Sequence, residues 1–196
     1  MIVNFGQSIF SINTISFENE GFIPIKYTGF GDDSSPPLTW EYPPEGTKSY
    51  VLVMSDLDAK DPYWGDEWKH WIVYNFPVSQ KGLPENSGAK NSVNLPAGAK
   101  HGATSWWEAG ILPGNYYQGP KPPTDTGAHR YVIRLFALDV PEINPFDDTG
   151  MGCSYYEVGQ SMAGHVLGFA DLKGKYEESF PWNLFMPAII TPHKRQ

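Results

Sequence analysis

The chain has 196 residues, of which 40% are apolar and 15% aromatic, enough for one domain with a substantial core. Its 14 basic and 22 acidic residues give a net charge of −8, which argues against nucleic-acid binding and against docking on anionic membranes through a basic patch. A single cysteine excludes an intrachain disulfide framework, and neither a signal peptide nor a run of about 20 apolar residues is evident, so we expect a cytoplasmic protein without a membrane span.

The first half of the chain predicts short strands between turns, as the 18 Pro and 20 Gly suggest for a β-rich domain. Alternation in Phe22–Tyr27 predicts a strand with one buried face. The apolar run Ser49–Met54 predicts a strand buried on both faces, and His70–Tyr74 predicts a second strand after a loop. That loop is expected to begin with Asp56 and Asp58, so both carboxylates should lie near a strand end.

The second half contains a long irregular stretch, a clear strand and a candidate helix. Pro77–Gly114 shows no strong periodicity, which is typical of an ordered loop region. Arg130–Leu138 is the clearest strand of the chain. Ser154–Phe169 predicts a helix, with Ser154 as N-cap and Glu157 at the capping-box position. We expect a single domain over residues 1–176, with 177–196 as an extension that packs on the body or on a second subunit of a homodimer.

Three polar residues near strand ends form the candidate site. They are Asp56, His70 and His129, and we expect them to converge on one small polar pocket. If strand parity holds throughout, His70 shares a face with Trp68, Ile72 and Tyr74, whereas His129 shares a face with Tyr131, Ile133 and Leu135.

The chemistry of this set leaves two uses open. A carboxylate beside two imidazoles favours their protonated form, and two such cations suit a phosphate-like anion. The same residues with neutral imidazoles could hold zinc, and a hydrolase acting on a phosphoester is the corresponding enzymatic alternative. For Asp58 a structural role is also expected, with Arg130 neutralising its carboxylate.

Four segments together resemble a known family. They are the proline loop SSPPLTW (Ser34–Trp40), the DxDA motif of Asp56–Ala59, WKHWIVYN (Trp68–Asn75), and GPKPPTDTGAHRYVIRLFALD (Gly119–Asp139). Their order and spacing are similar to those of the phosphatidylethanolamine-binding protein family, in its bacterial and archaeal branch often called Raf kinase inhibitor-like. The resemblance covers roughly Phe22 to Tyr176.

The resemblance implies a mainly β fold, with a large central antiparallel sheet, a smaller sheet and one or two helices near the C-terminus. It implies a small pocket for phosphate or phosphorylated headgroups, in a protein that regulates a kinase or protease and is not usually an enzyme. Carried over by motif, the residues that line the pocket are Asp56, His70, Pro123, His129 and Tyr131. Asp58 and Arg130 are expected to brace it, and neither a metal nor a cofactor is expected.

Two departures from the family pattern bear on ligand preference. Members commonly read D-P-D-A-P where this chain has Asp56 to Lys60 with no proline, so Lys60 adds a cation at the expected pocket mouth. The insertion Asp61–Trp68 is longer than in many bacterial relatives and is expected to bring aromatic and acidic groups to the entrance.

Overall fold

The protein is described by a computed structural model in which residues 8–62, 64–110, 114–147 and 152–178 are placed. The strands are β1 (Ser11–Asn13), β2 (Leu38–Glu41), β3 (Ser49–Lys60), β4 (Glu67–Pro77), β5 (Gly82–Leu83), β6 (Lys100–His101), β7 (His129–Leu138) and β8 (Val166–Tyr176). The helices are α1 (Ser105–Glu108) and α2 (Tyr155–Met162), preceded by a short 3-10 helix, η1 (Ile25–Tyr27).

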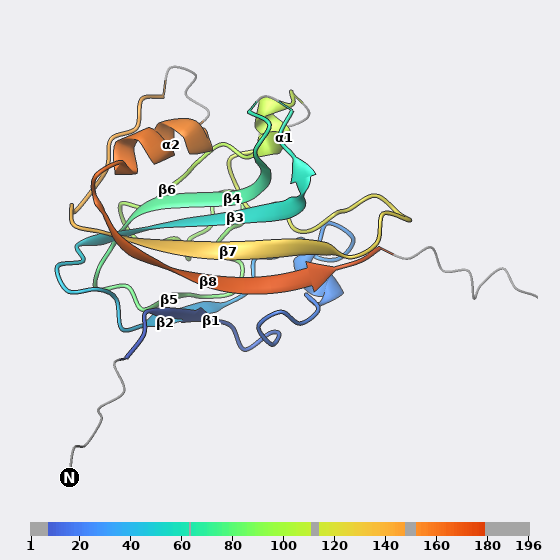
Figure 1. Cartoon of the computed structure of the whole chain (residues 1–196), viewed down its shortest axis with the longest axis horizontal. Coiled ribbons are helices and arrows are strands. Elements are labelled where there is room, and N and C mark those ends of the chain that lie inside the picture. Colours follow the sequence, from blue (N-terminus) through green and yellow to red (C-terminus); the bar gives the residue numbers. More distant parts are fainter. Residues whose placement is uncertain (1–7, 63, 111–113, 148–151, 179–196) are drawn as a thin grey trace, which may run out of the picture.

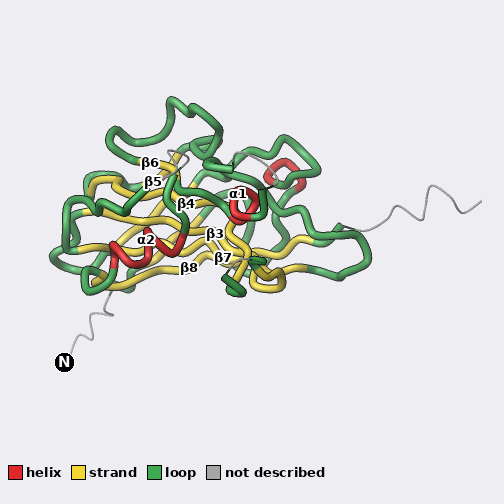
Figure 2. Tube along the Cα trace, turned by 90° about the horizontal axis from the view of Figure 1, so that it is seen from above, coloured by secondary structure: helices red, strands yellow, loops and turns green. Residues whose placement is uncertain are grey.

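The strands form two sheets, and the small sheet lies below β8 of the large sheet in the view of Figure 1. The large sheet has the order β6-β4-β3-β7-β8 and is antiparallel throughout, and the small sheet has the order β1-β2-β5. Long loops between β5 and β7 run beside the sheets (Figure 2). The predicted mainly β fold, with a large and a small sheet and a helix near the C-terminus, is confirmed.

Apolar side chains cover both faces of the large sheet. One cluster fills the space toward the small sheet and includes Trp40, Leu52 and Trp71. The other lies toward α2 and includes Val53 and Val158. Burial on both faces explains why Ser49–Met54 reads as a continuous apolar run.

A β-bulge interrupts the pairing of β3 with β4 at His70. Met54 pairs with Trp71 and Ser55 pairs with Lys69, so His70 has no opposite residue on β3. The bulge lets His70 lie on the same face as Trp71, against Tyr131 of the small-sheet cluster, while Ile72 belongs to the cluster under α2. The expectation that His70 shares a face with Ile72 and Tyr74 was therefore wrong, because strand parity fails across a bulge.

Two predicted elements differ in the structure. Residues 25–27 form η1, not a strand, and the Lys26 ammonium and Tyr27 hydroxyl both contact the distant Glu85 carboxylate, at 2.6 and 2.9 Å. The predicted helix begins as expected, with a capping box between Ser154 and Glu157. It ends at residue 162, and residues 166–169 instead join β8, where they pair with β7.

The two aspartates expected to open a loop lie inside β3. Asp56 pairs with Trp68 on one side and with Tyr131 on the other, and β3 continues to Lys60. The carboxylates are therefore held by a strand, which fixes them more firmly than a loop would.

Candidate functional site

Asp56 and His129 form a buried pair between two neighbouring strands. The Asp56 Oδ2 atom lies 2.7 Å from His129 Nδ1, and both side chains are almost fully buried. The other carboxylate oxygen, Oδ1, accepts a hydrogen bond from the backbone N–H of Asp58 at 2.8 Å. Both carboxylate oxygens are therefore engaged, and the imidazole ring has a fixed orientation.

The second nitrogen of His129 faces the loop that precedes β7. His129 Nε2 lies 3.1 Å from Thr126 Oγ1, and the Thr126 hydroxyl donates to the Pro123 carbonyl at 2.8 Å. A hydroxyl has only one proton to donate. With that proton on the Pro123 carbonyl, a hydrogen bond to Thr126 requires a proton on Nε2, and the ring is then a cation that faces Asp56.

His70 reaches the same region from the bulge of β4. Its ring is 2% exposed and lies edge-on to Trp106, with centroids 4.7 Å apart, and to Tyr131, with centroids 5.3 Å apart. Its Nδ1 is 2.6 Å from the backbone carbonyl of Gln118. Asp56 and His129 both shift the pKa of His70, so the three side chains share one electrostatic environment.

Burial sets the protonation state of His70. Desolvation lowers the pKa of this imidazole to about 4, although the Gln118 carbonyl and the Asp56 carboxylate both act to raise it. The ring is therefore neutral near pH 7. Because a carbonyl can only accept, the single proton lies on Nδ1, and Nε2 presents a lone pair that accepts a hydrogen bond.

Tyr131 forms a wall of this cluster. Its ring is buried, and its hydroxyl makes no hydrogen bond with any of the residues that the structure places. Burial, followed by the nearby Asp56 carboxylate, raises the pKa of the Tyr131 hydroxyl, which therefore keeps its proton. A buried hydroxyl without a partner is costly, and a bound ligand would satisfy it.

Asp58 and Arg130 lie beside the cluster and pair with each other. Arg130 Nη2 is 2.6 Å from Asp58 Oδ1, Nε is 3.0 Å from Oδ2, and the Arg130 backbone N–H donates to Oδ2 at 2.7 Å. This fork of hydrogen bonds lowers the pKa of Asp58 to about 2. The pair joins the end of β3 to the start of β7, next to Asp56 and His129.

The other residues expected at the site lie at its edge. Pro122 is buried, whereas Pro123 is exposed and contributes its carbonyl to Thr126. Lys60 is exposed at the end of β3. In the insertion, Trp64 stacks on Tyr156 of α2, on the other face of the large sheet, and Tyr63 lies outside the described residues. The proposed extension beyond Glu178 also lies outside the described residues.

Residues 13–177 match the family model described as phosphatidylethanolamine-binding protein. The chain belongs to the phosphatidylethanolamine-binding protein family. The resemblance inferred from the proline loop, the DxDA motif and the two histidine segments is thereby confirmed.

Relatives of this family are found in archaea and bacteria. A UPF0098 protein of Methanothermobacter thermautotrophicus is 38% identical over 167 residues, which span 85% of this chain and 97% of that protein. The crystal structure of Escherichia coli YbcL, described as a new member of the mammalian PEBP family, superposes with a TM-score of 0.73 at 28% identity, over 86% of this chain and 98% of that one. A putative phosphatidylethanolamine-binding protein homolog from Chlamydia trachomatis superposes with a TM-score of 0.68 at 31% identity, over 86% of this chain and 97% of that one.

The structure adds three contributors that the sequence did not reveal. The Gln118 carbonyl fixes the His70 tautomer, the Trp106 ring covers His70, and the Thr126 hydroxyl contacts His129. A backbone carbonyl leaves no trace in the residue type, so Gln118 could not have been found. Thr126 belongs to the family-like segment before His129, and its position three residues upstream was the only available signal.

The residues that the structure describes contain no set of side-chain donors that supports the zinc alternative. No three His, Cys, Asp or Glu side chains placed by the structure come together in an arrangement suited to a metal ion, so Asp56, His70 and His129 do not form one. Among the same residues, no helix has the length and apolar character needed to cross a bilayer.

Proposed function

We propose that this family member is a non-enzymatic binding protein whose buried Asp56–His129 pair, together with His70 and Tyr131, takes a phosphate group, either free or on a phosphorylated headgroup. Ligand occupancy would in turn modulate a kinase or protease partner. The observation that carries the proposal is the meeting of two imidazoles from β4 and β7 around one buried carboxylate of β3.

The hydrogen-bonding roles of the side chains support this proposal. Thr126 Oγ1, 3.1 Å from His129 Nε2, occupies a position that a phosphate oxygen can take. His70 offers an acceptor at Nε2 and Tyr131 offers a donor, so a protonated phosphate oxygen and an unprotonated one can both be satisfied. The Asp56 charge is balanced by His129 as a cation, which reduces the repulsion between the carboxylate and a bound anion.

The hydrolase alternative receives no support from the site or from the relatives. Asp56 uses both carboxylate oxygens, in contacts with His129 and the Asp58 backbone, so it is not positioned as a free nucleophile. The archaeal relative and the two solved structures described above are not named for a hydrolytic activity.

Titration calorimetry with inorganic phosphate and with phosphoethanolamine tests the proposal. We expect His129→Ala to weaken phosphate binding about tenfold or more, the usual effect of removing a charged hydrogen-bond donor. His165→Ala is the matched control, because His165 pairs with Asp139 in a partly exposed position away from the cluster and its loss should leave affinity unchanged. Equal affinities of wild type and His129→Ala for phosphate would overturn the proposal.

A further inference from the structure

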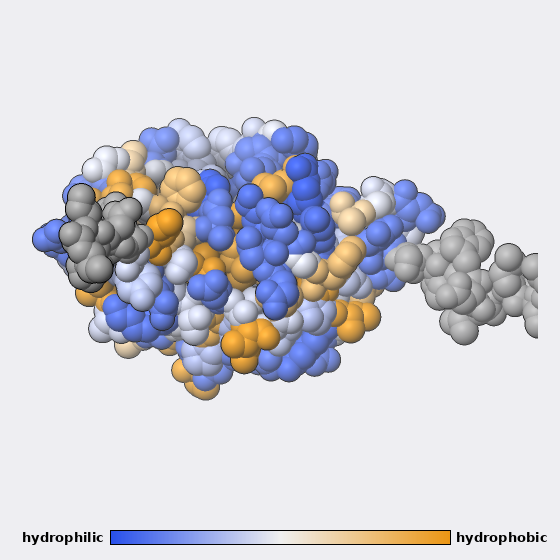
Figure 3. Space-filling view, turned by 60° about the horizontal axis from the view of Figure 1, so that its bottom comes forward, coloured by the Kyte–Doolittle hydropathy of each residue, from blue (hydrophilic) through white to orange (hydrophobic). Residues whose placement is uncertain are grey.

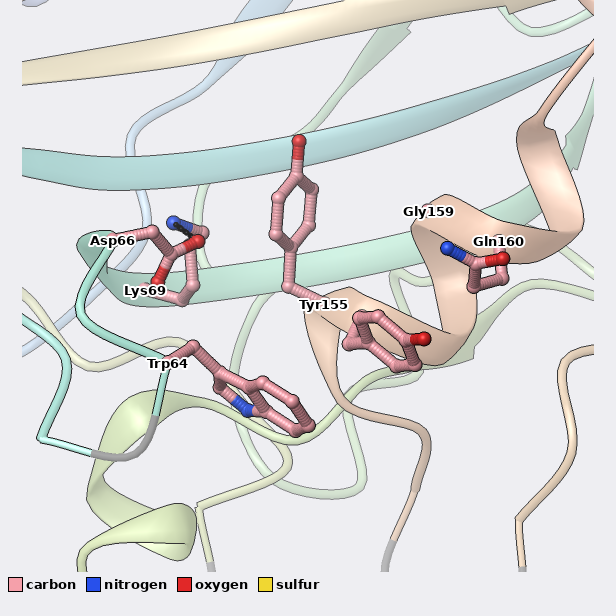
Figure 4. A pocket seen from close by; sticks show the side chains of 7 residues that line it. Trp64, Asp66, Lys69, Tyr155, Gly159 and Gln160 are labelled. Atoms are coloured by element: carbon pink, nitrogen blue, oxygen red, sulfur yellow. Dashed lines mark hydrogen bonds and ion pairs between the residues drawn. The ribbon is translucent and has the colours of Figure 1, made fainter.

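A pocket lies on the face of the large sheet opposite to the Asp56–His129 cluster, where the loop between β3 and β4 meets α2 (Figure 4). It has a cavity volume of about 320 Å³. The residues that line it are Trp64, Asp66, Lys69, Tyr155, Tyr156, Gly159 and Gln160. It shares no residue with the Asp56–His129 cluster, and the family assignment does not account for it.

Aromatic rings form the walls of this pocket. The Trp64 and Tyr156 rings stack with centroids 4.9 Å apart and an interplanar angle of 6°, although each side chain is about half exposed, at 49% and 51%. The Tyr155 side chain, which projects from the start of α2 (Figure 4), also lines the pocket. The faces of aromatic rings carry the negative part of the ring quadrupole, which attracts cations.

The one cation in the lining, Lys69, already contacts two oxygens and a ring of the protein. Its buried Nζ lies 2.9 Å from Asp66 Oδ2, 2.6 Å from the Glu67 carbonyl and 4.6 Å from the centre of the Tyr155 ring. Two of the three N–H donors of this ammonium group are taken by these oxygens, and its charge is met by the Asp66 carboxylate and the face of the Tyr155 ring. Lys69 is therefore already engaged by protein groups.

The charges around the pocket favour a cation. Arg134, the other nearby cation, is held by Asp171 through two hydrogen bonds of 2.7 Å. Asp66 and Glu67 carry two negative charges beside the single positive charge of Lys69, and Glu67 Oε2 lies 4.0 Å from Lys69 Nζ. One negative charge is therefore in excess. The Asp66 and Glu67 side chains are 43% and 45% exposed, so their carboxylates can also face a ligand.

The charges that act on Tyr155 also indicate a negative electrostatic potential in the pocket. Burial raises the pKa of the Tyr155 hydroxyl; Arg134 acts in the opposite direction, and the Glu67 and Asp66 carboxylates raise it further. The ring thus lies within the field of both acidic side chains.

Gly159 leaves the helix side of the pocket open. A Cβ added at this position would meet no atom within 4 Å. A side chain at position 159 therefore begins in open space at the lining of the pocket, which makes Gly159→Leu a substitution directed at filling it.

We propose that this pocket binds a small organic cation, specifically an alkylammonium group, which would lie against the aromatic faces with Asp66 and Glu67 as its counter-charges. The inference is independent of phosphate binding at the Asp56–His129 cluster.

Choline and 3,3-dimethyl-1-butanol, a neutral molecule of the same shape, are the probes for this proposal. Titrations followed by the indole N–H signal of Trp64 and the amide signal of Gly159 should show choline binding about tenfold more tightly than the alcohol, as expected for cation–π attraction together with a carboxylate. Equal affinities would mean an apolar slot without charge recognition and would overturn the proposal. Shifts of these two signals with inorganic phosphate but not with choline would overturn it as well.

Variants locate the binding. Gly159→Leu should abolish the choline-dependent shifts, and Asp66→Asn should weaken choline binding several-fold. Tyr42→Ala removes an exposed aromatic residue elsewhere and should change nothing. If choline binds Gly159→Leu as tightly as wild type, while the circular dichroism spectrum shows the variant to be folded, the ligand lies outside this pocket and the proposal is wrong.

Discussion

The hydrogen bond between His70 and the Gln118 carbonyl gives the site its chemical character. It places the proton on Nδ1 and leaves Nε2 as an acceptor. Burial lowers the pKa of the ring to about 4, so the ring is neutral at higher pH. Two protonated imidazoles, as the sequence suggested, are therefore not available together near neutral pH. The imidazole that contacts the Asp56 carboxylate is that of His129, with Nδ1 at 2.7 Å from Oδ2.

The depressed pKa of His70 predicts a pH-dependent loss of stability. A histidine in the unfolded chain has a pKa near 6.5, so acid protonates the unfolded state first. The contribution of the neutral ring is fully present above about pH 6.5 and falls by roughly 3 kcal/mol as the pH approaches the folded pKa of about 4. Urea unfolding of wild type and His70→Gln between about pH 7 and about pH 4.5 measures this loss.

Other titrating groups change the free energy of unfolding with pH equally in wild type and His70→Gln, so the comparison of the two proteins isolates His70. The free energy of unfolding of His70→Gln should decrease less between the two pH values than that of wild type, whatever its absolute stability. Parallel decreases in the two proteins would show that the ring titrates normally and would remove the basis for treating His70 as a neutral acceptor.

At the level of elements, the sequence predicted those features of β7 and α2 that depend on neighbouring residues in the chain. The faces of β7 follow strict alternation, with Tyr131, Ile133 and Leu135 in one cluster, because β7 pairs with β3 without interruption there. The start of α2 was also predictable, since its capping box closes within four residues.

The failures have causes that are distant in sequence. Glu85 holds η1 through contacts about sixty positions along the chain, and pairing with β7 ends α2 early by drawing residues 166–169 into β8. The bulge at His70 depends on the register between two strands, which alternation within one strand cannot reveal. The expectation that His70 converges with Asp56 and His129 came from their positions near strand ends and from the matched motifs, and it stays a prediction as far as a common ligand site is concerned.

The capping box of α2 provides a prediction at this scale. The Ser154 backbone N–H donates to Glu157 Oε2 at 2.7 Å, and the Ser154 hydroxyl also contacts this carboxylate. Ser154→Ala should lower the free energy of unfolding by about 1 kcal/mol, measured by urea denaturation. Because Tyr155 and Tyr156 follow the cap directly, choline binding should weaken as well.

Ser161→Ala is the control for this prediction, since it makes the same replacement inside α2, away from the cap. It should be neutral or slightly stabilising, because alanine is the better helix former. If both variants lose equal stability, the cap contributes nothing specific to α2.

At the level of the molecule, the large sheet separates two sets of polar side chains. Alternation along β4 directs the consecutive residues Lys69 and His70 to opposite faces, with His70 toward Tyr131 and Lys69 toward Tyr155. With the bottom of Figure 1 turned forward, apolar side chains occur in separate areas among hydrophilic ones (Figure 3).

This separation predicts that phosphate and choline stabilise the protein independently. Each ligand that binds only the folded state raises the free energy of unfolding, by about 2.7 kcal/mol when present at 100 times its dissociation constant. The two sites share no residue and lie on opposite faces of the sheet, so their effects should add. Thermal unfolding with each ligand alone and with both together gives the comparison.

Two variants, each altered at one of the two sites, test this independence. His129→Ala should lose the phosphate effect and keep the choline effect, and Gly159→Leu should do the reverse, because each substitution changes only one face. A variant that loses both effects would instead show that the strands between the sites transmit binding. In that case β4, which carries His70 and Lys69 side by side, would be the element to test next for coupling between the two sites.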